Sequence, residues 1–212
     1  MSAIHHLQKS ETPDVTRLHI SGISYGFISS LGEEFVRRLY EAIAASEYGF
    51  GVVAEDSGEV SGFVVFTSDL PKLYRSVLQQ GGFKLMLAIG PKMLKPAVIK
   101  RIVCNLFYPS KTSKLNLPNA ELLAIAIAPQ EQGKGLGREL CEAGFEQCRK
   151  RGISRLKVLV AENNEPANRL YKKCGFEFVT QVYSHGRPSN IYVKDISEND
   201  GSGSAGISSF DK

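Results

Sequence analysis

The sequence lacks the features that mark a membrane, secreted or disulfide-rich protein. No segment approaches the roughly 20 uncharged apolar residues that a helix needs to cross a bilayer. Residues 1–14 contain no apolar stretch of the kind found in secretory signals. Four cysteines are present without Cys-x-x-Cys spacing, so we expect reduced, partly buried thiols. These absences together favour a cytoplasmic protein.

Metal-ligating side chains are also few and scattered. His5 and His6 lie in a polar N-terminal stretch, His19 lies in a predicted strand, and His185 lies at a predicted hairpin. The cysteines have no ligand partners at the spacings of zinc sites. The sequence therefore predicts no metal site, and His185 is kept only as a reserve catalytic base.

Acidic residues are nearly absent from residues 68–119. This segment holds nine basic residues and one acid, Asp69, for a net charge of +8, whereas the rest of the chain carries −4. A basic insertion in an acidic body favours contact with an acidic partner, an acidic acceptor or a membrane surface. A solvated helix face balanced by neighbouring acidic surface explains the pattern equally well, and both interpretations stay open.

What is present is the pattern of one α/β domain, since 212 residues suffice for a sizeable core. Apolar periodicity and turn residues predict the order of elements. Strands are expected at residues 16–23, 50–55, 59–67, 121–128, 155–160, 176–184 and 189–196. Helices are expected at residues 25–30, 31–45, 136–151 and 165–174.

The remaining segments divide the chain into parts. Residues 1–15 are expected to be loose, residues 16–196 to form the domain, and residues 197–212 to be a disordered tail. Within the basic insertion, residues 71–108 read as amphipathic helices broken at Gly81-Gly82 and Gly90-Pro91.

The most informative stretch is the glycine-dense turn at residues 129–138, between a predicted strand and a predicted helix. Such a turn presents unpaired backbone N–H groups beside the positive end of the helix dipole, which suits a phosphate or pyrophosphate. A Walker loop is excluded because Gly133-Lys134 is followed by Gly135 and not by Ser or Thr. A dinucleotide fingerprint is excluded because Gly133, Gly135 and Gly137 have the wrong spacing.

Two motifs around this turn resemble those of the GCN5-related N-acetyltransferase (GNAT) superfamily. The pattern Gln132-x-x-Gly135-x-Gly137 is similar to its Q/R-x-x-G-x-G/A signature. About 30 residues further on, the stretch from Asn164 to Phe176 (Asn-x-x-Ala-x-x-Leu-Tyr-x-Lys-x-Gly-Phe) resembles the motif on the pantetheine side. The resemblance implies a mixed, mostly antiparallel central sheet flanked by helices, with the helical insertion between the third and fourth strands.

The resemblance also implies a site for acetyl-CoA or another acyl-CoA. The pyrophosphate is expected on the backbone of Gln132, Gly133, Lys134, Gly135, Leu136, Gly137 and Arg138. The pantetheine arm is expected to pair with Ile125, Ala126 and Ile127. Asn164 is expected chiefly as a helix cap with a secondary role at the pantetheine, and Asn168 could face the cofactor.

Glu121 and Tyr171 are the expected catalytic residues. An amine must be neutral to attack a thioester, and a carboxylate can accept its proton. Period-2 alternation places Glu121 on the face of Leu123, Ile125 and Ile127. It stands as far before Gln132 as the glutamate base of the histone-acetylating branch does before that motif. Tyr171 occupies the position where the superfamily often carries a tyrosine beside the CoA sulfur.

The sequence therefore predicts an N-acetyltransferase that moves an acetyl group from acetyl-CoA to a primary amine directly, in a ternary complex. The acceptor is a small molecule or peptide that the sequence does not identify, and no specific nucleic acid is expected. Two alternatives stay open: a catalytically silent CoA-binding regulatory module, and a protein whose basic insertion mainly binds anionic membrane or nucleic acid. A homodimer is also left open.

Overall fold

The computed structural model describes residues 2–23, 27–89, 116–184 and 187–197. Several subjects of the sequence predictions lie outside these ranges: the predicted break at Gly90-Pro91, most of the later half of the basic insertion with Cys104, His185, and residues 198–212 of the tail. Among the described helices, none is both long and apolar enough to span a bilayer.

One seven-stranded sheet organises the described chain, with strands in the order β1-β2-β3-β4-β5-β7-β6. Neighbouring strands run antiparallel except for β4 and β5, which are parallel. Their bounds are β1 Ala3–His6, β2 Gly49–Asp56, β3 Glu59–Thr67, β4 Glu121–Ile127, β5 Arg155–Ala161, β6 Glu177–Ser184 and β7 Arg187–Asp195. The predicted mixed, mostly antiparallel sheet is confirmed.

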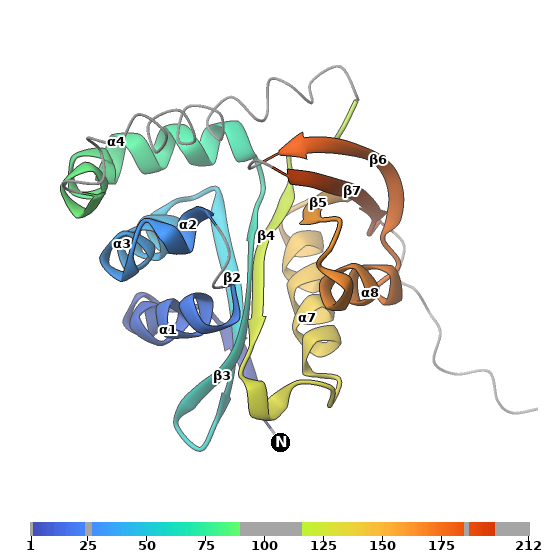
Figure 1. Cartoon of the computed structure of the whole chain (residues 1–212), viewed down its shortest axis with the longest axis horizontal. Helices are drawn as coiled ribbons and strands as arrows, with labels where there is room; N and C mark the ends of the chain where they lie inside the picture. The colour runs from blue at the N-terminus through green and yellow to red at the C-terminus, as the bar shows by residue number, and fades with distance from the viewer. Residues whose placement is uncertain (1, 24–26, 90–115, 185–186, 198–212) are drawn as a thin grey trace, which may run out of the picture.

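Helices cover both faces of this sheet (Figure 1). On one face lie α1 Thr12–Gly22, α2 Phe27–Ser30, α3 Glu33–Ala45 and α4 Leu70–Ile89, and on the other lie α7 Leu136–Lys150 and α8 Glu165–Lys173. Each layer has its own apolar core. Phe63 and Val65 of β3 point toward the α1–α4 side, whereas Val64 and Phe66 point toward α7. The alternating strand residues thus supply both cores.

The N-terminal prediction is wrong in two respects. Residues 3–6 are not loose but form edge strand β1, which pairs antiparallel with β2. Residues 16–23 do not form a strand, because they continue helix α1, which begins at Thr12 with Pro13 in its first turn. Val15 and His19 are both buried and lie four residues apart, which is the spacing of one face of a helix. The β-branched residues of this stretch favour a strand by local preference and so obscure the helical pattern.

The helical insertion leaves and rejoins the domain at one point. The Leu70 N–H donates to the Asn119 carbonyl at 3.0 Å, and the Asn119 side chain donates to Asp69. The predicted break at Gly81-Gly82 is wrong, since α4 runs through both glycines. Each glycine costs a helix only about 1 kcal/mol relative to alanine, and the earlier turns are anchored by buried Leu73 and Val77.

Helix α7 lies unusually close to the sheet because of a glycine. A Cβ added at Gly144 would lie 2.2 Å from the Phe66 ring of β3, so only glycine allows this approach. Phe145, next to it, contacts both Phe66 and Phe176. This packing fixes the axis of α7, and with it the place where the helix N-terminus meets the end of β4.

Candidate functional site

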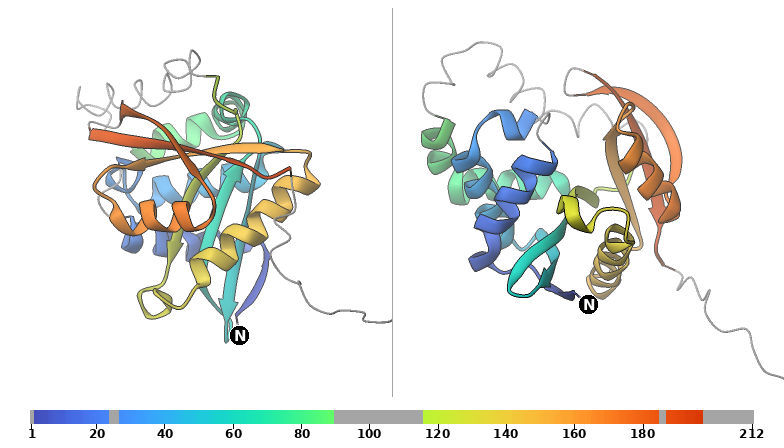
Figure 2. Two further views of the ribbon diagram at one scale, coloured as in Figure 1. Left: turned by 90° about the vertical axis from the view of Figure 1, so that its right-hand side faces the viewer. Right: turned by 60° about the horizontal axis from the view of Figure 1, so that its bottom comes forward.

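The sheet opens between β4 and β5. These strands pair only through Glu121 with Lys157 and Leu122 with Val158. Beyond that contact β5 follows β7, and the group β5, β7 and β6 crosses β2–β4 at a steep angle (Figure 2, left). In the described residues, the edge of β4 from Leu123 to Ile127 that faces β5 therefore has no strand partner. Such an edge can accept an extended ligand that carries amide groups.

A β-bulge at Leu123 corrects the predicted orientation of Glu121. Phe66 pairs with Leu122 and Val65 pairs with Ala124, so Leu123 is the extra residue of β4. Ile125 and Ile127 consequently pack with Leu122 on the α7 side. Glu121 precedes Leu122 and faces the opposite side, together with its cross-strand neighbour Lys157. The prediction that Glu121 shares the face of Ile125 and Ile127 is wrong, because the bulge changes the side on which the preceding residues of β4 lie.

Glu121 is a buried carboxylate with a basic partner. Its exposed fraction is 7%, that of Lys157 is 4%, and Lys157 Nζ lies 3.4 Å from Glu121 Oε2. Burial raises the pKa of Glu121, while the charge and hydrogen bond of Lys157 pull that pKa down. Lys157 also donates to the Pro118 carbonyl, which ties the base of the insertion to the same point.

The glycine turn has the conformation that the sequence predicts. Gly133 and Gly135 have φ of 79° and 98°, in the left-handed region that favours glycine, and Gly135 is the N-cap residue of α7. The backbone N–H groups at both ends of the turn already have partners, since Gln132 N–H donates to the Pro129 carbonyl and Arg138 N–H donates to the Gly135 carbonyl. Within the described chain, the hydrogen bonds of turns and caps leave the N–H groups of residues 133–137 unused.

Charged and polar side chains surround this turn. Lys134 and Arg138 are exposed, and Lys134 Nζ lies 3.0 Å from Glu131 Oε1. The Gln132 side chain donates to the carbonyl of Ile127 at 3.0 Å, which fastens the turn to the end of β4. A Cβ added at Gly133 would meet nothing within 4 Å. The turn therefore presents unpaired backbone donors at the positive end of the α7 dipole, with open space at Gly133, which suits an anion.

Tyr171 lies in the core between α8 and α7. Its ring packs edge-on against Phe176 with the centroids 5.7 Å apart, and its exposed fraction is 5%. Burial raises the pKa of its phenol, with smaller contributions from Cys141, Cys174 and Glu121. A phenol in this environment stays protonated at neutral pH, so it can donate a hydrogen bond or a proton.

The two asparagines of the second motif differ in role. Asn164 Oδ1 accepts the N–H of Ala167 at 3.3 Å, so its predicted capping role is confirmed. The Asn168 amide donates to three carbonyls of residues 161–164, and its Oδ1 accepts from Asn190 and Tyr192. These internal bonds occupy the side-chain amide of Asn168 and join α8 to β7. Asn168 is therefore not part of the proposed cofactor site.

The sequence reasoning missed Lys157 and the buried pair His19 and Tyr40, which lies in the α1–α4 layer. Lys157 was detectable, because a lysine inside the apolar run 156–160 has to be paired. His19 Nδ1 lies 2.7 Å from the Tyr40 hydroxyl, and burial lowers the pKa of His19 to about 4. Three of the cysteines, Cys141, Cys148 and Cys174, are buried and free, as predicted.

The described chain thus combines a sheet that opens between β4 and β5 with a glycine turn at the start of the following helix. Residues 20–176 match the acetyltransferase (GNAT) family. Because this match spans most of the chain, the protein belongs to the GNAT family, and the predicted family membership is confirmed.

Solved structures of low sequence identity share the fold. The ribosomal-protein-S18-alanine N-acetyltransferase from Escherichia coli aligns with a TM-score of 0.60 at 18% identity, over 97% of this chain and 100% of that one. The yncA protein from Salmonella typhimurium, solved with its cofactor acetyl-CoA, aligns with a TM-score of 0.57 at 15% identity, over 96% of this chain and 99% of that one.

Curated relatives match over a shorter segment. Mycothiol acetyltransferase from Streptosporangium roseum is 44% identical over 59 residues, which is 28% of this chain and 18% of that protein. Mycothiol acetyltransferase from Thermobifida fusca is 37% identical over 70 residues, which is 33% of this chain and 22% of that protein. The aligned part of the chain thus spans about a fifth of the length of these relatives.

Proposed function

We propose that the chain is an acetyl-CoA-dependent N-acetyltransferase that acts by direct transfer in a ternary complex. The observation that carries this proposal is the position of the β4–β5 opening, which runs from Glu121 at one end to the glycine turn at the other. An acyl-CoA has a matching order of groups: a thioester, an amide-bearing arm and a pyrophosphate. Family membership and the fold shared with an acetyl-CoA complex support the same assignment.

In the proposed site the chain holds the cofactor through its backbone. The free N–H groups of residues 133–137 and the dipole of α7 bind the pyrophosphate, with Lys134 and Arg138 nearby. The unpaired edge of β4 at residues 125–127 bonds the amides of the pantetheine arm as a neighbouring strand would. Backbone N–H groups of the same edge stabilise the oxyanion that forms on the thioester.

Glu121 is the proposed base and Tyr171 the proposed acid. Glu121 accepts a proton from the ammonium form of the acceptor, directly or through water, and the neutral nitrogen then attacks the thioester carbonyl. As the carbon–sulfur bond breaks, the Tyr171 phenol donates its proton to the leaving thiolate. The nitrogen, which became cationic on attack, releases its second proton to water, and the phenolate regains a proton from water. Burial raises the pKa of the Glu121 carboxylate, which strengthens it as a base. Burial also raises the pKa of the Tyr171 phenol, which favours a hydrogen bond to the thiolate over early proton transfer.

The proposed acceptor is a primary amine on a small molecule or peptide. The name of the mycothiol acetyltransferase relatives favours a small-molecule acceptor. A protein N-terminus, a lysine side chain, an amino sugar and a polyamine are the acceptors to compare.

The decisive experiment measures thiol release from acetyl-CoA with this panel of amines, for the whole chain and for Glu121→Gln. We expect at least one amine class to be acetylated. The variant should lower kcat/KM by about 10²-fold or more at neutral pH and by less at high pH, where the amine is already neutral. An unchanged pH profile would remove Glu121 from the mechanism, and CoA binding without transfer to any amine would favour the silent regulatory module.

A further inference from the structure

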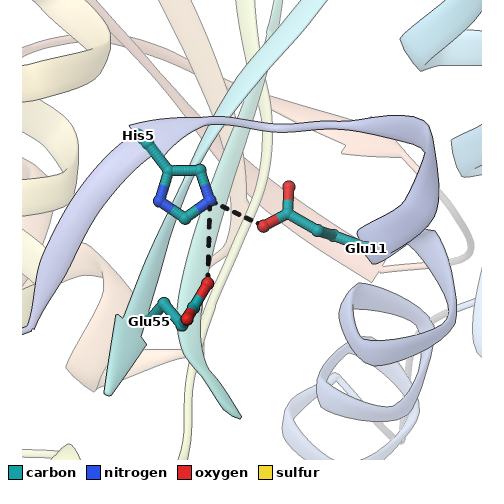
Figure 3. A group of neighbouring side chains, drawn as sticks. All are labelled: His5, Glu11 and Glu55. Atoms are coloured by element: carbon teal, nitrogen blue, oxygen red, sulfur yellow. Dashed lines mark hydrogen bonds and ion pairs between the residues drawn. The ribbon is translucent and has the colours of Figure 1, made fainter. Parts of the chain in front are cut away.

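A second cluster of polar side chains lies at the far edge of the sheet from the β5–β7 end. His5 projects from β1, Glu55 from β2, and Glu11 from the short helix η1 Lys9–Glu11 that precedes α1 (Figure 3). Among the described residues, these three form the one group of His, Cys, Asp or Glu with ligand atoms all within 4.8 Å of one another. The proposed acetyltransferase mechanism does not use them.

Two carboxylate oxygens lie near a single imidazole nitrogen. His5 Nε2 lies 2.7 Å from Glu11 Oε1 and 4.0 Å from Glu55 Oε2 (Figure 3). Around a tetrahedral zinc ion with bonds of about 2.0–2.1 Å, ligand atoms stand roughly 3.3 Å apart. The observed distances bracket this value, so small rotations of the side chains bring all three atoms into a first coordination shell.

The cluster is organised by its surroundings. Glu55 pairs with Ala3 across β1 and β2, which places His5 as its diagonal neighbour on the same face. The other oxygen of Glu11, Oε2, accepts the N–H of Gln8 at 2.6 Å, which orients the carboxylate toward His5. A hydrogen bond to the non-ligating oxygen is the kind of support that positions metal ligands.

The charge balance of the cluster favours a cation. Two carboxylates face one imidazole, which is charged only when protonated. In the described residues, neither Glu11 nor Glu55 forms an ion pair with a lysine or arginine. The Glu11 and Glu55 side chains are 14% and 41% exposed, so one carboxylate is sheltered while the group keeps an opening to solvent.

We propose that His5, Glu11 and Glu55 bind a divalent transition metal ion, with Zn²⁺ the best match to one nitrogen and two oxygen ligands. Water from the open side supplies the fourth ligand. The ion joins β1 to β2 and both to the start of α1, so it stabilises the N-terminal edge of the fold. This site is independent of acyl transfer, and it revises the expectation, drawn from ligand spacing alone, that the chain binds no metal.

The test uses the whole chain without a histidine tag, stripped of metal with a chelator and then dialysed. Thermal unfolding is followed while Zn²⁺ is added, for the unmodified chain and for His5→Gln and Glu55→Gln. His6→Gln is the matched control, because His6 is the exposed neighbour of His5 on the same strand and does not belong to the cluster. Mg²⁺ at the same concentration controls for a general effect of divalent charge.

We expect saturating Zn²⁺ to raise Tm of the unmodified chain and of His6→Gln by about 5 °C or more. His5→Gln and Glu55→Gln should lose most of this shift, and Mg²⁺ should produce little of it. The proposal is overturned if Zn²⁺ leaves Tm of the unmodified chain unchanged. It is equally overturned if His5→Gln responds to Zn²⁺ as the unmodified chain does, since binding would then occur elsewhere.

Discussion

At the scale of single residues, the candidate site depends on groups whose burial changes their chemistry. Glu121 keeps a carboxylate in an apolar layer because Lys157 lies beside it, 3.4 Å away. Removing either partner would leave the other charge buried and unpaired, which is costly. The pair thus keeps a carboxylate buried at the paired end of the β4–β5 opening, where the proposed base is needed.

Tyr171→Phe separates the chemistry of the phenol from its packing. The ring contact with Phe176 remains, so we expect Tm to change little. The proton donor to the thiolate is lost, so kcat should fall by about 10²-fold while KM for acetyl-CoA stays near its original value. Steady-state kinetics and a melting curve on the same preparation check this. A variant with full kcat would assign Tyr171 to the core alone.

At the scale of elements, the conformation of the glycine turn and the cap of α8 were predictable because both depend on residues close together in the chain. Glycines in a turn after an apolar strand indicate positive φ, and Gly133 and Gly135 have it. Asn164 before a helical pattern indicates a cap, and it caps α8. These features follow from residues close together in the chain, which a sequence displays directly.

The features that were not predictable depend on contacts between distant residues. The bulge at Leu123 arises from the register of β4 against β3 and reverses the face of Glu121. Residues 16–23 carry strand-forming side chains, yet they fold as helix because Val15 and His19 are buried against the sheet. Local preference is overridden where tertiary packing contributes more.

Two glycines of equal geometry test the proposed phosphate site. Gly133 and Gly58 have φ of 79° and 85°, and an added Cβ meets nothing within 4 Å at either position. Gly133→Ala and Gly58→Ala should therefore lose similar stability, about 1 kcal/mol. Only Gly133→Ala should raise KM for acetyl-CoA, by about tenfold or more, because its Cβ enters the proposed phosphate site. Equal KM values in the two variants would contradict the assignment.

At the scale of the whole molecule, acid stability is expected to depend on a buried pair outside the proposed cofactor site. His19 and Tyr40 lie in the α1–α4 layer, with His19 Nδ1 close to the Tyr40 hydroxyl. His19 is neutral when folded, with a pKa of about 4 against 6.5 for an unperturbed histidine. The unfolded chain therefore binds a proton first as the pH falls. Stability present above pH 6.5 is lost progressively toward pH 4.

His19→Asn tests this pH dependence. Asparagine does not titrate and can keep a hydrogen bond to the Tyr40 hydroxyl in place of Nδ1. Between pH 7.5 and 5, the unmodified chain should lose about 2 kcal/mol of unfolding free energy more than the variant does. Urea unfolding at the two pH values measures the difference. An equal loss in both proteins would show that another group controls acid stability.

The central claim is that acetyl-CoA binds across the β4–β5 opening, from the unpaired strand edge to the glycine turn. Titration of the whole chain with acetyl-CoA, followed by the backbone amide signals in an NMR spectrum, tests this most directly. The account predicts that the largest shifts fall on residues 123–127 and 133–137, while the β2–β3 turn at Ser57 and Gly58 stays unchanged. Absence of binding, or shifts confined to other parts of the chain, would contradict it.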